Sequence, residues 1–389
     1  MSVERFLSSR LKPSSRMASV CIIISFIVMI LAVAISSGFR NEIGRGISDI
    51  CGDVRITPAN MDILSGNKPI KYPAPYLNYV DSLDGVCSVT PVVYRAGLVR
   101  SNETIHGVMF KGVPGFSAAH DSLTLAVSIP SRLASMLKLQ NGDKLQSYFI
   151  GDKLKARSFR IIEVYDAVLE SDDQLVVKMD IADLQRINAW TSEMVSAYEI
   201  LLEDNSIKRM TEVADETGFM ATMLSGEDEV PLISVPASKA YPQMFDWLEL
   251  IDFNVLVILL LMTVVAGFNM ISGLLIMLFE NISTIGLLKS LGMNDRPIAK
   301  VFLMSSSRVI LKGMIIGNAA AILLCLLQDA THILTLSPEN YFLSFVPVHL
   351  DFPMILLADL CAYLVIMAFL FIPSLFISKV DPARTVRVR

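Results

Sequence analysis

Few residues in this sequence combine the type and the spacing that catalysis requires. Its 389 residues contain no Gly-x-x-x-x-Gly-Lys-Ser/Thr phosphate loop, no Gly-x-Ser-x-Gly nucleophile turn and no His-Glu-x-x-His metal motif. Without the first motif the chain cannot cradle ATP phosphates in a Walker A loop. Without the other two, no acid, base or metal constellation indicates an enzyme. We therefore expect a chain that is not itself catalytic and binds no cofactor.

Scattered acidic, histidine and cysteine side chains also give no clear sign of a reactive site. The acidic runs at 169–174 and 227–229 lack the ligand spacing of an EF-hand and are typical of solvated loops. His106 and His120 each stand alone in the sequence. Cys51 and Cys87 could form a disulfide in an oxidising compartment, but the sequence gives no distance between them.

One carboxylate, Asp359, lies within an apolar stretch. Ionisable residues inside membrane helices are rare, which makes Asp359 a functional candidate. It lies about two helical turns after Phe352, near the end of the stretch, so an interfacial or helix-capping role is equally open. Asn254, Asn269 and Asn318 also lie in apolar sequence and could hydrogen-bond between helices.

The composition is that of a membrane protein. Hydrophobic residues make up 53% of the chain and charged residues 18%, and the mean hydropathy is +0.54. A soluble globular chain usually contains about a quarter charged residues. The formal net charge of −5 offers no basic surface that could displace counterions from a nucleic acid, so we expect no nucleic-acid partner.

Four apolar segments are long enough to cross a bilayer, which requires about 20 residues in a helix. They lie at 17–38, 251–279, 309–327 and 354–377. The first has an alternative interpretation as a cleaved signal peptide, because Ala32-Val33-Ala34 resembles a cleavage site. Its uncharged run exceeds the usual signal core of about 7–15 residues, so we favour an uncleaved span.

The distribution of Lys and Arg predicts the orientation. Basic residues cluster in the tail 1–16, in the connection 280–308 and in the tail 378–389, whereas 328–353 contains none. Both termini and the connection 280–308 are therefore predicted to be cytoplasmic. The segments 39–250 and 328–353 are predicted to lie outside.

The segment 39–250 has the mixed pattern of an α+β domain inserted between the first and second spans. Alternating apolar residues predict strands at 53–57, 87–93 and 158–164. Helices are predicted at 130–139, with Ser128 as a possible cap, and at 181–190. A turn is predicted at Asn141-Gly142-Asp143. The fold class is thus a membrane protein with four transmembrane helices and a large extracytoplasmic α+β domain.

The connection after the second span predicts a helix, a glycine break and a second helix. The second span is expected to continue as helix through Ile285 to Leu291, and Gly292 is suited to a helix C-terminus. Asn294 or Asp295 can then cap a short amphipathic helix whose first turn contains Pro297. On these grounds the segment is either a docking surface or a solvated connector.

The third span contains a small-residue motif. Gly313 and Gly317 form a Gly-x-x-x-Gly pair, and Ala321 follows one turn later. Small residues at this spacing let two helices approach closely, which favours helix association without naming the partner.

Several short segments, taken in order, resemble a known family. Near the N-terminus, an aromatic-x-x-x-Arg-Leu opening and a Gly-Phe-x-x-Glu exit from the first span are matched by Phe6, Arg10, Leu11, Gly38, Phe39 and Glu42. In the outer domain, Lys-Gly-Val and Leu-Ala-x-x-Leu…Gly-Asp elements are matched by Lys111, Gly112, Val113, Leu133, Ala134, Leu137, Gly142 and Asp143. Later similar segments lie at 265–270, 285–292, 338–342, 346–347 and 382–384.

This order and spacing resembles the FtsX-like permease superfamily, and within it the LolC/LolE type of lipoprotein-releasing permease, over essentially the whole chain. One departure from the family pattern is that Ser128-Ile129-Pro130 replaces the usual Gly before the Leu-Ala element.

The resemblance implies a permease of the bacterial inner membrane that pairs with an identical or a paralogous permease and docks on a separate ABC ATPase, which binds the ATP. Such permeases extract acylated lipoproteins from the membrane and pass them to a periplasmic carrier. Spans one and two would line a cavity for lipid. The segment that contacts the ATPase would include Glu280, Lys289, Gly292, Met293, Asn294, Asp295 and Arg296.

A second interpretation stays open. The chain could be a mechanotransmission permease of the FtsX/MacB type, acting in efflux or in regulation of a periplasmic partner. Both kinds of permease would use ATP through a partner subunit, but only a lipoprotein exporter would release acylated protein to a soluble carrier.

Overall fold

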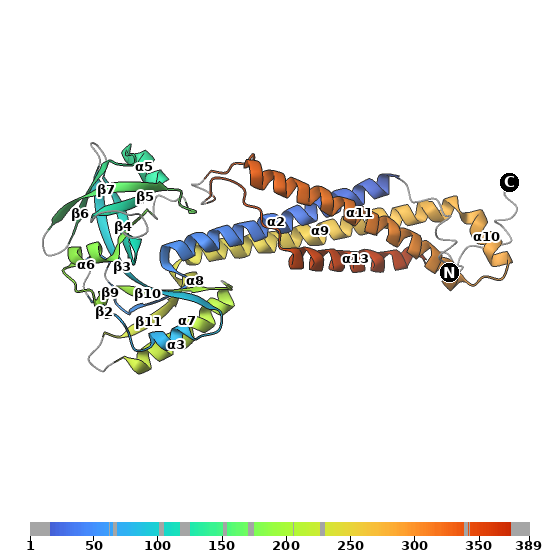
Figure 1. Ribbon diagram of the computed structural model, residues 1–389. Coiled ribbons are helices and arrows are strands. Elements are labelled where there is room, and N and C mark those ends of the chain that lie inside the picture. The colour runs from blue at the N-terminus through green and yellow to red at the C-terminus, as the bar shows by residue number, and fades with distance from the viewer. Residues whose placement is uncertain are drawn as a thin grey trace. The chain divides into compact units, whose positions relative to one another are not determined.

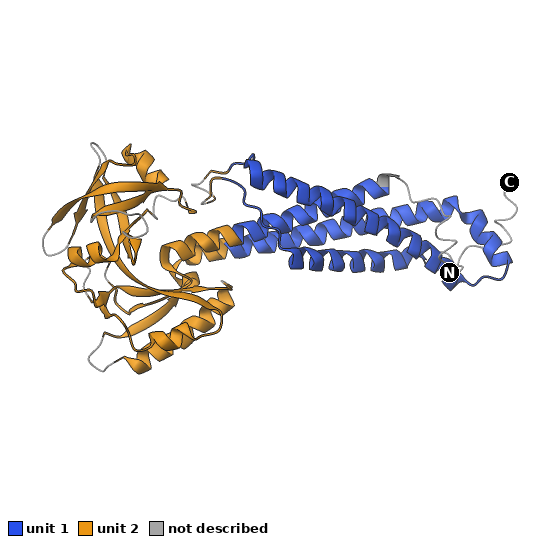
Figure 2. Cartoon of the chain, in the orientation of Figure 1, with its two compact units in different colours: residues 1–40, 248–335, 345–389 blue, residues 41–247, 336–344 orange. Residues whose placement is uncertain are grey.

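The fold is described from a computed structural model. It describes residues 16–61, 63–64, 68–100, 105–116, 125–150, 154–169, 175–204, 206–225, 230–337, 341 and 343–374. The chain divides into two compact units (Figure 2). The helical unit comprises 1–40, 248–335 and 345–389, and the sheet unit comprises 41–247 and 336–344. The acidic run 227–229, His120, Phe6, Arg10 and Leu11, and the C-terminal tail 378–389 lie outside the described residues.

Four helices in the described part of the chain are long and apolar enough to cross a membrane (Figure 1). They are α2 (Arg16–Cys51), α9 (Pro242–Glu280), α11 (Asp295–Thr331) and α13 (Phe352–Ser374). Three of them extend well beyond the apolar segments of the sequence, because polar flanking residues continue the same helical backbone. Residues 375–377 of the fourth predicted span lie outside the described residues.

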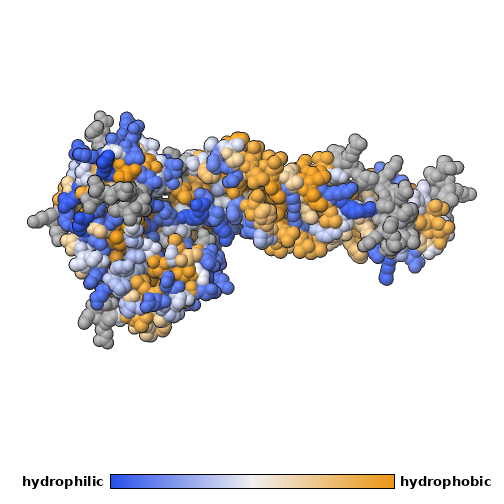
Figure 3. All heavy atoms as spheres, in the orientation of Figure 1, coloured by the Kyte–Doolittle hydropathy of each residue, from blue (hydrophilic) through white to orange (hydrophobic). Residues whose placement is uncertain are grey.

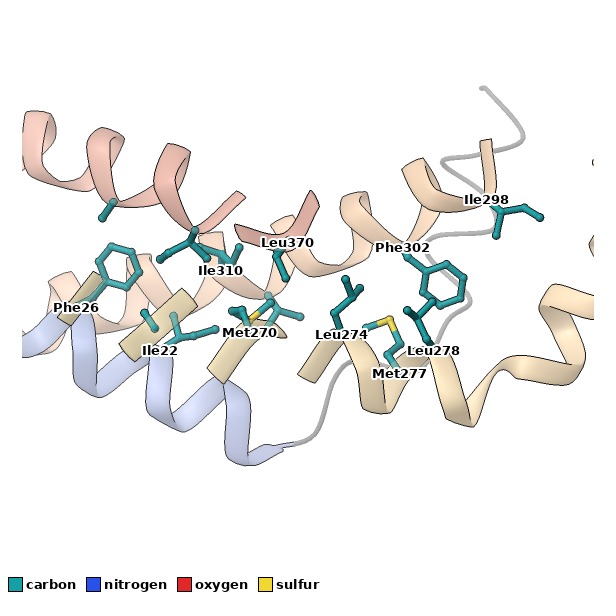
Figure 4. Close-up of a cluster of buried hydrophobic side chains, with 14 of the residues drawn as sticks. Ile22, Phe26, Met270, Leu274, Met277, Leu278, Ile298, Phe302, Ile310 and Leu370 are labelled. Carbon is teal, nitrogen blue, oxygen red and sulfur yellow. The ribbon is translucent and has the colours of Figure 1, made fainter. Parts of the chain in front are cut away.

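The core of the helical unit is built from all four long helices (Figure 4). Fully buried side chains include Ile22 and Phe26 of α2, Met270 of α9, Ile310 of α11 and Leu370 of α13. The outward faces are apolar as well. Hydrophobic residues gather over the helices in Figure 3, and the exposed ones include Leu256, Leu260, Phe268, Leu323 and Leu364. A helix that is apolar all round is typical of burial in lipid.

The sheet unit contains, within the described residues, a nine-stranded sheet in the order β11-β1-β10-β3-β4-β8-β5-β7-β6. Its strands are β1 (Val54–Pro58), β3 (Val86–Arg100), β4 (Ile105–Val113), β5 (Ala126–Pro130), β6 (Lys144–Phe149), β7 (Lys155–Tyr165), β8 (Val176–Asp180), β10 (Ala197–Leu202) and β11 (Leu232–Pro236). A two-stranded sheet pairs β2 (Ile70–Lys71) with β9 (Met194–Val195). The helices are α3 (Leu77–Asp81), α5 (Ser131–Leu137), α6 (Ile181–Asn188), α7 (Ile207–Leu224) and α8 (Ala237–Ala240).

The long strand β3 connects the two halves of the large sheet. Its first part pairs with β10, and its second part pairs with β4 and β6. All the strands of the large sheet fall, along the chain, between α2 and α9. The short segment 336–344 also belongs to this unit, where Tyr341 contacts Trp247 edge-on at 6.3 Å between ring centroids.

Most of the local predictions for this unit match the structure. The predicted strands correspond to β1, β3 and β7, the predicted helices to α5 and α6, and the predicted turn to Gly142 with a φ of +97°. The proposed cap at Ser128 is wrong. Ser128 lies in β5, its hydroxyl donates to Glu163 at 2.7 Å, and the cap position of α5 is Pro130. Strand pairing between β5 and β7 continues through Pro130, so the helix begins later.

Cys51 and Cys87 are both free thiols. Cys51 is buried at the end of α2, whereas Cys87 is exposed at the start of β3. The disulfide left open by the sequence is therefore not formed in this structure.

Candidate functional site

The predicted coupling segment, 280–296, begins with a break in the helix. The helix α9 ends at Glu280, and a separate helix, α10 (Ile282–Ser290), follows Asn281. Asn281 has a φ of −109°, outside helical geometry. The prediction of one continuous helix to Leu291 is therefore wrong. The polar side chain of Asn281 instead donates back to the Met277 carbonyl at 2.8 Å.

The turn between α10 and α11 is built around Gly292. Its φ is +88°, a backbone conformation that favours glycine, and nothing lies within 4 Å of where a Cβ would be. Asn294 is the N-cap residue of α11, and its side chain makes no cap hydrogen bond. Lys289 and Asp295 form an ion pair across the turn, with 2.8 Å between Nζ and Oδ1.

The coupling segment has a buried side and an exposed apolar tip. Ile285 of α10 and Ile298 of α11 are 1% and 0% exposed and belong to the core of the helical unit. Leu287 and Leu291 are instead 57% and 76% exposed. The remaining predicted coupling residues are half-buried at Met293 and exposed at Glu280, Asn294 and Arg296. Exposed leucines on a segment whose other side packs into the core are suited to docking against another protein.

The short amphipathic helix predicted after Gly292 is not a separate element. Residues 295–308 form the first turns of α11, which continues without a break to Thr331. No glycine lies between Pro297 and Gly313, and Pro297 falls in the first turn, where proline is tolerated. The coupling segment is thus joined directly to the third membrane helix.

The small-residue motif of α11 packs within this chain. A Cβ added at Gly313 would lie 2.6 Å from the Ile22 Cγ2 atom, and one at Gly317 would lie 2.8 Å from Phe26 Cβ. Ala321 is fully buried in a cluster with Ile30 of α2. These three small residues therefore let α11 approach α2 closely.

Asp359 is paired inside the helical unit. It is 5% exposed, and its Oδ2 atom accepts a hydrogen bond from the side-chain amide of Asn318 in α11. The capping alternative is wrong, because α13 begins at Phe352 and Asp351 accepts from the Met354 amide at 3.2 Å. Within the described residues, Asp359 Oδ1 and Asn318 Oδ1 are both buried without a hydrogen-bond partner.

A second polar contact connects α2 with α9. Arg40 forms an ion pair with Asp252, and the Ser36 hydroxyl donates to the same carboxylate at 2.6 Å. Arg40 remains largely exposed. The contact holds the exit of the first span against the entry of the second.

The C-terminal end of α2 is fixed to the large sheet by Lys111 of β4. Its Nζ donates to the carbonyls of Asp49 and Ile50 at 2.7 and 3.2 Å, and pairs with Glu199 of β10 at 2.8 Å. The Tyr94 hydroxyl of β3 hydrogen-bonds the same carboxylate. A buried ammonium at a helix C-terminus satisfies carbonyls that have no partner in the helix and complements the helix dipole.

Two further features complete this joint between helix and sheet. The Asp49 carboxylate pairs with Lys178 of β8 at 2.7 Å, near the solvent. Gly52 has a φ of +72°, and a Cβ there would lie 2.9 Å from Glu199 Cβ. The chain can therefore leave α2 and enter β1 only with glycine at this position.

Burial controls the ionisation of the acidic groups at the joint. It raises the pKa of the Glu199 carboxyl, and the neighbouring Lys111 ammonium opposes this shift. Burial also raises the pKa of Asp53, opposed by hydrogen bonds from Ser48 and from the Leu202 amide. No group of three or more His, Cys, Asp or Glu side chains that could hold a metal lies among the described residues.

The C-terminal third of the chain is similar to a known family. Residues 256–382, which contain the coupling segment, α11 and α13, match the FtsX-like permease C-terminal family. These residues resemble the C-terminal domain of FtsX-like permeases. Over nearly its whole length the permease also resembles the LolC/LolE type. FtsX-like permeases of this type are membrane transport subunits.

Two curated relatives extend the similarity of the permease to nearly the full chain. The lipoprotein-releasing system transmembrane protein LolC of Xylella fastidiosa is 21% identical, over 92% of this chain and 90% of the relative. The corresponding LolE protein of Haemophilus influenzae is 22% identical, over 95% of this chain and 93% of the relative.

Solved structures of outer domains are also similar to part of the permease. The extracellular domain of the ABC-type transporter YknZ from Gram-positive bacteria is 13% identical, covers 47% of this chain and 98% of its own, and gives a TM-score of 0.31. The periplasmic region of MacB from Actinobacillus actinomycetemcomitans is 13% identical, covers 51% and 94%, and gives a TM-score of 0.30.

Sequence reasoning missed the joint at the end of α2. In the sequence, Lys111 stands out only as part of a family-like Lys-Gly-Val element, and Glu199 belongs to no motif. A signal was present, because both charges interrupt apolar strand sequence, at His-Gly-Val-Met-Phe-Lys111 and Ala-Tyr-Glu199-Ile-Leu-Leu. A charge in a buried strand usually has a partner, but the sequence does not say which one.

Proposed function

We propose that this permease is the membrane subunit of an ABC transporter that extracts lipoproteins from the inner membrane and passes them to a periplasmic carrier. A separate ATPase subunit supplies the energy. The observation that carries the proposal is the extent of the similarity to lipoprotein-releasing permeases, which covers 92% and 95% of this chain. Similarity over both the helices and the sheet unit favours a shared task more than similarity of a single domain would.

In this proposal both termini and the coupling segment are cytoplasmic, and the sheet unit and the segment 328–353 are periplasmic. The support is the basic residues at Lys289, Arg296 and Lys300, set against their absence from 328–353. The exposed Leu287 and Leu291 would contact the ATPase, and α11 would carry the movement directly into the membrane.

The permease would act with a second permease subunit, either identical or a paralogue. The Gly313 face of α11 is occupied by α2 of the same chain, so the second subunit would contact other helix surfaces. The outward apolar faces of α9, α11 and α13 would contact this subunit and membrane lipids. The lipid-binding cavity would be lined by α2 and α9.

The fixed end of α2 favours a second candidate function. A membrane helix fastened to a sheet by Lys111 and Glu199 can transmit force without any cargo entering the membrane. A mechanotransmission permease, serving efflux or regulating a periplasmic partner, would need this joint equally.

Reconstitution separates the two candidates. The permease, its co-purifying ATPase and a fluorescent acylated lipoprotein are placed in proteoliposomes, and the release of lipoprotein to a soluble carrier is measured. We expect release that requires hydrolysable ATP and fails with the same protein lacking its acyl chains. ATP hydrolysis without release would contradict lipoprotein export and favour mechanotransmission.

A further inference from the structure

The sheet unit contains a pocket of about 790 Å³, lined mainly by apolar side chains and within the size range of ligand pockets in proteins. We call it the sheet pocket. Its floor is the face of β3, β4 and β8, and includes Leu98, Met109 and Val176. Leu64 and Ile150 form its rim and are 58% and 47% exposed. All its lining residues belong to the sheet unit.

The register of the strands puts the floor residues on one side of the sheet. Ala96 pairs with Met109, and Leu98 pairs with Gly107, so these four residues face the same way. Tyr94 and Lys111 are the next pair on that face, which places the joint at the end of α2 beside the pocket. Ile50, in the last turn of α2, itself lines the pocket.

The lining chemistry is suited to a hydrocarbon. Among the described residues that form the pocket none carries a charge, and polar side chains come only from Tyr241 and Gln243. A bound peptide segment would bring backbone N–H and C=O groups that need partners. At the centre of the floor Met109 is already paired with Ala96 on one side and Val176 on the other, so its backbone groups are used within the sheet. An acyl chain has no such groups and gains affinity of about fourfold for each methylene buried.

We propose that the sheet pocket binds an acyl chain of the lipoprotein while it is transferred from the membrane to the carrier. This inference rests on the proposed function and adds a binding site for the hydrocarbon outside the membrane helices. Two membrane helices reach the pocket at their ends, α2 through Ile50 and α9 through Gln243. A change at either of these helix ends would therefore alter the lining of the pocket directly.

Gly107 allows the pocket to be filled without disturbing the fold. It lies on β4 opposite Leu98, and nothing is found within 4 Å of where its Cβ would be. Gly107→Phe would put a ring into the pocket, and Gly107→Leu would fill it less. Ser158→Phe is the matched control, because Ser158 is exposed on β7 and does not line the pocket.

The test uses a lipoprotein whose acyl chain carries a photoreactive group, in proteoliposomes that contain the permease and its ATPase. We expect ATP-dependent labelling of the peptides that contain Leu98 and Met109. Gly107→Phe should lower this labelling about tenfold and slow release, Gly107→Leu should have a smaller effect, and Ser158→Phe should have none. Thermal unfolding of each variant checks that the fold is retained.

The outcomes separate this inference from the proposed function. Release by the wild-type permease, with labelling outside the pocket or unchanged in both Gly107 variants, would overturn the pocket assignment and leave lipoprotein export standing. Equal labelling of the pocket by a photoreactive phospholipid would overturn the assignment to lipoprotein. Absence of any ATP-dependent release from the wild type would overturn the proposed function first.

Discussion

Lys111 and Glu199 form a buried ion pair across an intervening strand. Lys111 lies on β4 and Glu199 on β10, and β3 runs between them in the sheet. The two side chains are 5% and 8% exposed, with 2.8 Å between Nζ and Oε1. Tyr94 of β3 binds the same carboxylate, and Lys111 also binds the last carbonyls of α2. A single buried cation therefore holds two strands and the end of a membrane helix together.

Replacing Lys111 should destabilise the sheet unit strongly. Lys111→Met removes one partner of a buried ion pair and leaves Glu199 without its counter-charge, which costs about 3–5 kcal/mol. Urea unfolding of the detergent-solubilised chain measures this, because Trp190 and Trp247, the two tryptophans of the chain, both lie in the sheet unit.

The matched control is Lys178→Met, whose pair with Asp49 is solvent-accessible, and it should cost at most about 1 kcal/mol. The double variant Lys111→Met with Glu199→Gln should recover part of the loss. Equal losses for Lys111→Met and Lys178→Met would contradict the central role of Lys111.

Asp53 should make the stability of the sheet unit depend on pH. Its pKa in the folded state is raised above 3.8 by burial, so the folded chain binds the proton more tightly than the unfolded chain. The free energy of unfolding therefore decreases as the pH rises from 3.8 through the folded-state pKa of Asp53. Asp53→Asn cannot lose a proton and should show a smaller decrease over this interval. Thermal unfolding across the acidic range measures the difference, and identical slopes for the two proteins would contradict the prediction.

The Asn318–Asp359 pair should stabilise the contact between α11 and α13. Asp359→Leu leaves the Asn318 amide without this partner in an apolar surrounding and should cost about 1–2 kcal/mol. Asp359→Asn supplies N–H donors where Asn318 Oδ1 now has none, and should raise the unfolding temperature in detergent. Replacing both residues with Leu should recover most of the loss. If Asp359→Asn lowered the unfolding temperature as much as Asp359→Leu, the negative charge of Asp359 would be what stabilises the contact.

Gly317 should tolerate no larger side chain. A Cβ there would lie 2.8 Å from Phe26 Cβ and 2.9 Å from the Ile23 carbonyl oxygen, so Gly317→Leu must push α2 away from α11. We expect a loss of about 1–3 kcal/mol, measured as thermal stability in detergent. Ile316→Leu is the control, because Ile316 is 53% exposed. Gly317→Leu that kept full stability and lost only self-association would contradict the packing within one chain.

The exposed tip of the coupling segment should be needed for ATPase binding. Leu291 is 76% exposed, so Leu291→Glu should leave the fold unchanged and lower the ATPase recovered in a pull-down by about tenfold. Thr284→Glu places the same charge at another exposed position of the segment and should have a weaker effect. Full recovery with Leu291→Glu would remove this residue from the proposed docking surface.

The sequence predicted well the features that depend on neighbours along the chain. A membrane helix depends on about 20 consecutive apolar residues, and a strand such as β1 on a local alternation of side chains. The turn at Gly292 was predicted for the same reason, since a glycine after an apolar helical run indicates a C-terminus. The errors at Asn281 and Ser128 concern element boundaries, where local preferences compete and packing determines which one is adopted.

The partners of buried charges and small residues required the folded chain. Lys111 meets Glu199 because of the order β10-β3-β4, and Gly317 meets Phe26 because α11 packs on α2. Asn318 meets Asp359 because α13 packs on α11. A residue's preference for burial or for small size is set by its own chemistry and can be read locally. The atom that it contacts is set by the arrangement of elements far apart in the chain, which depends on the packing of the whole core.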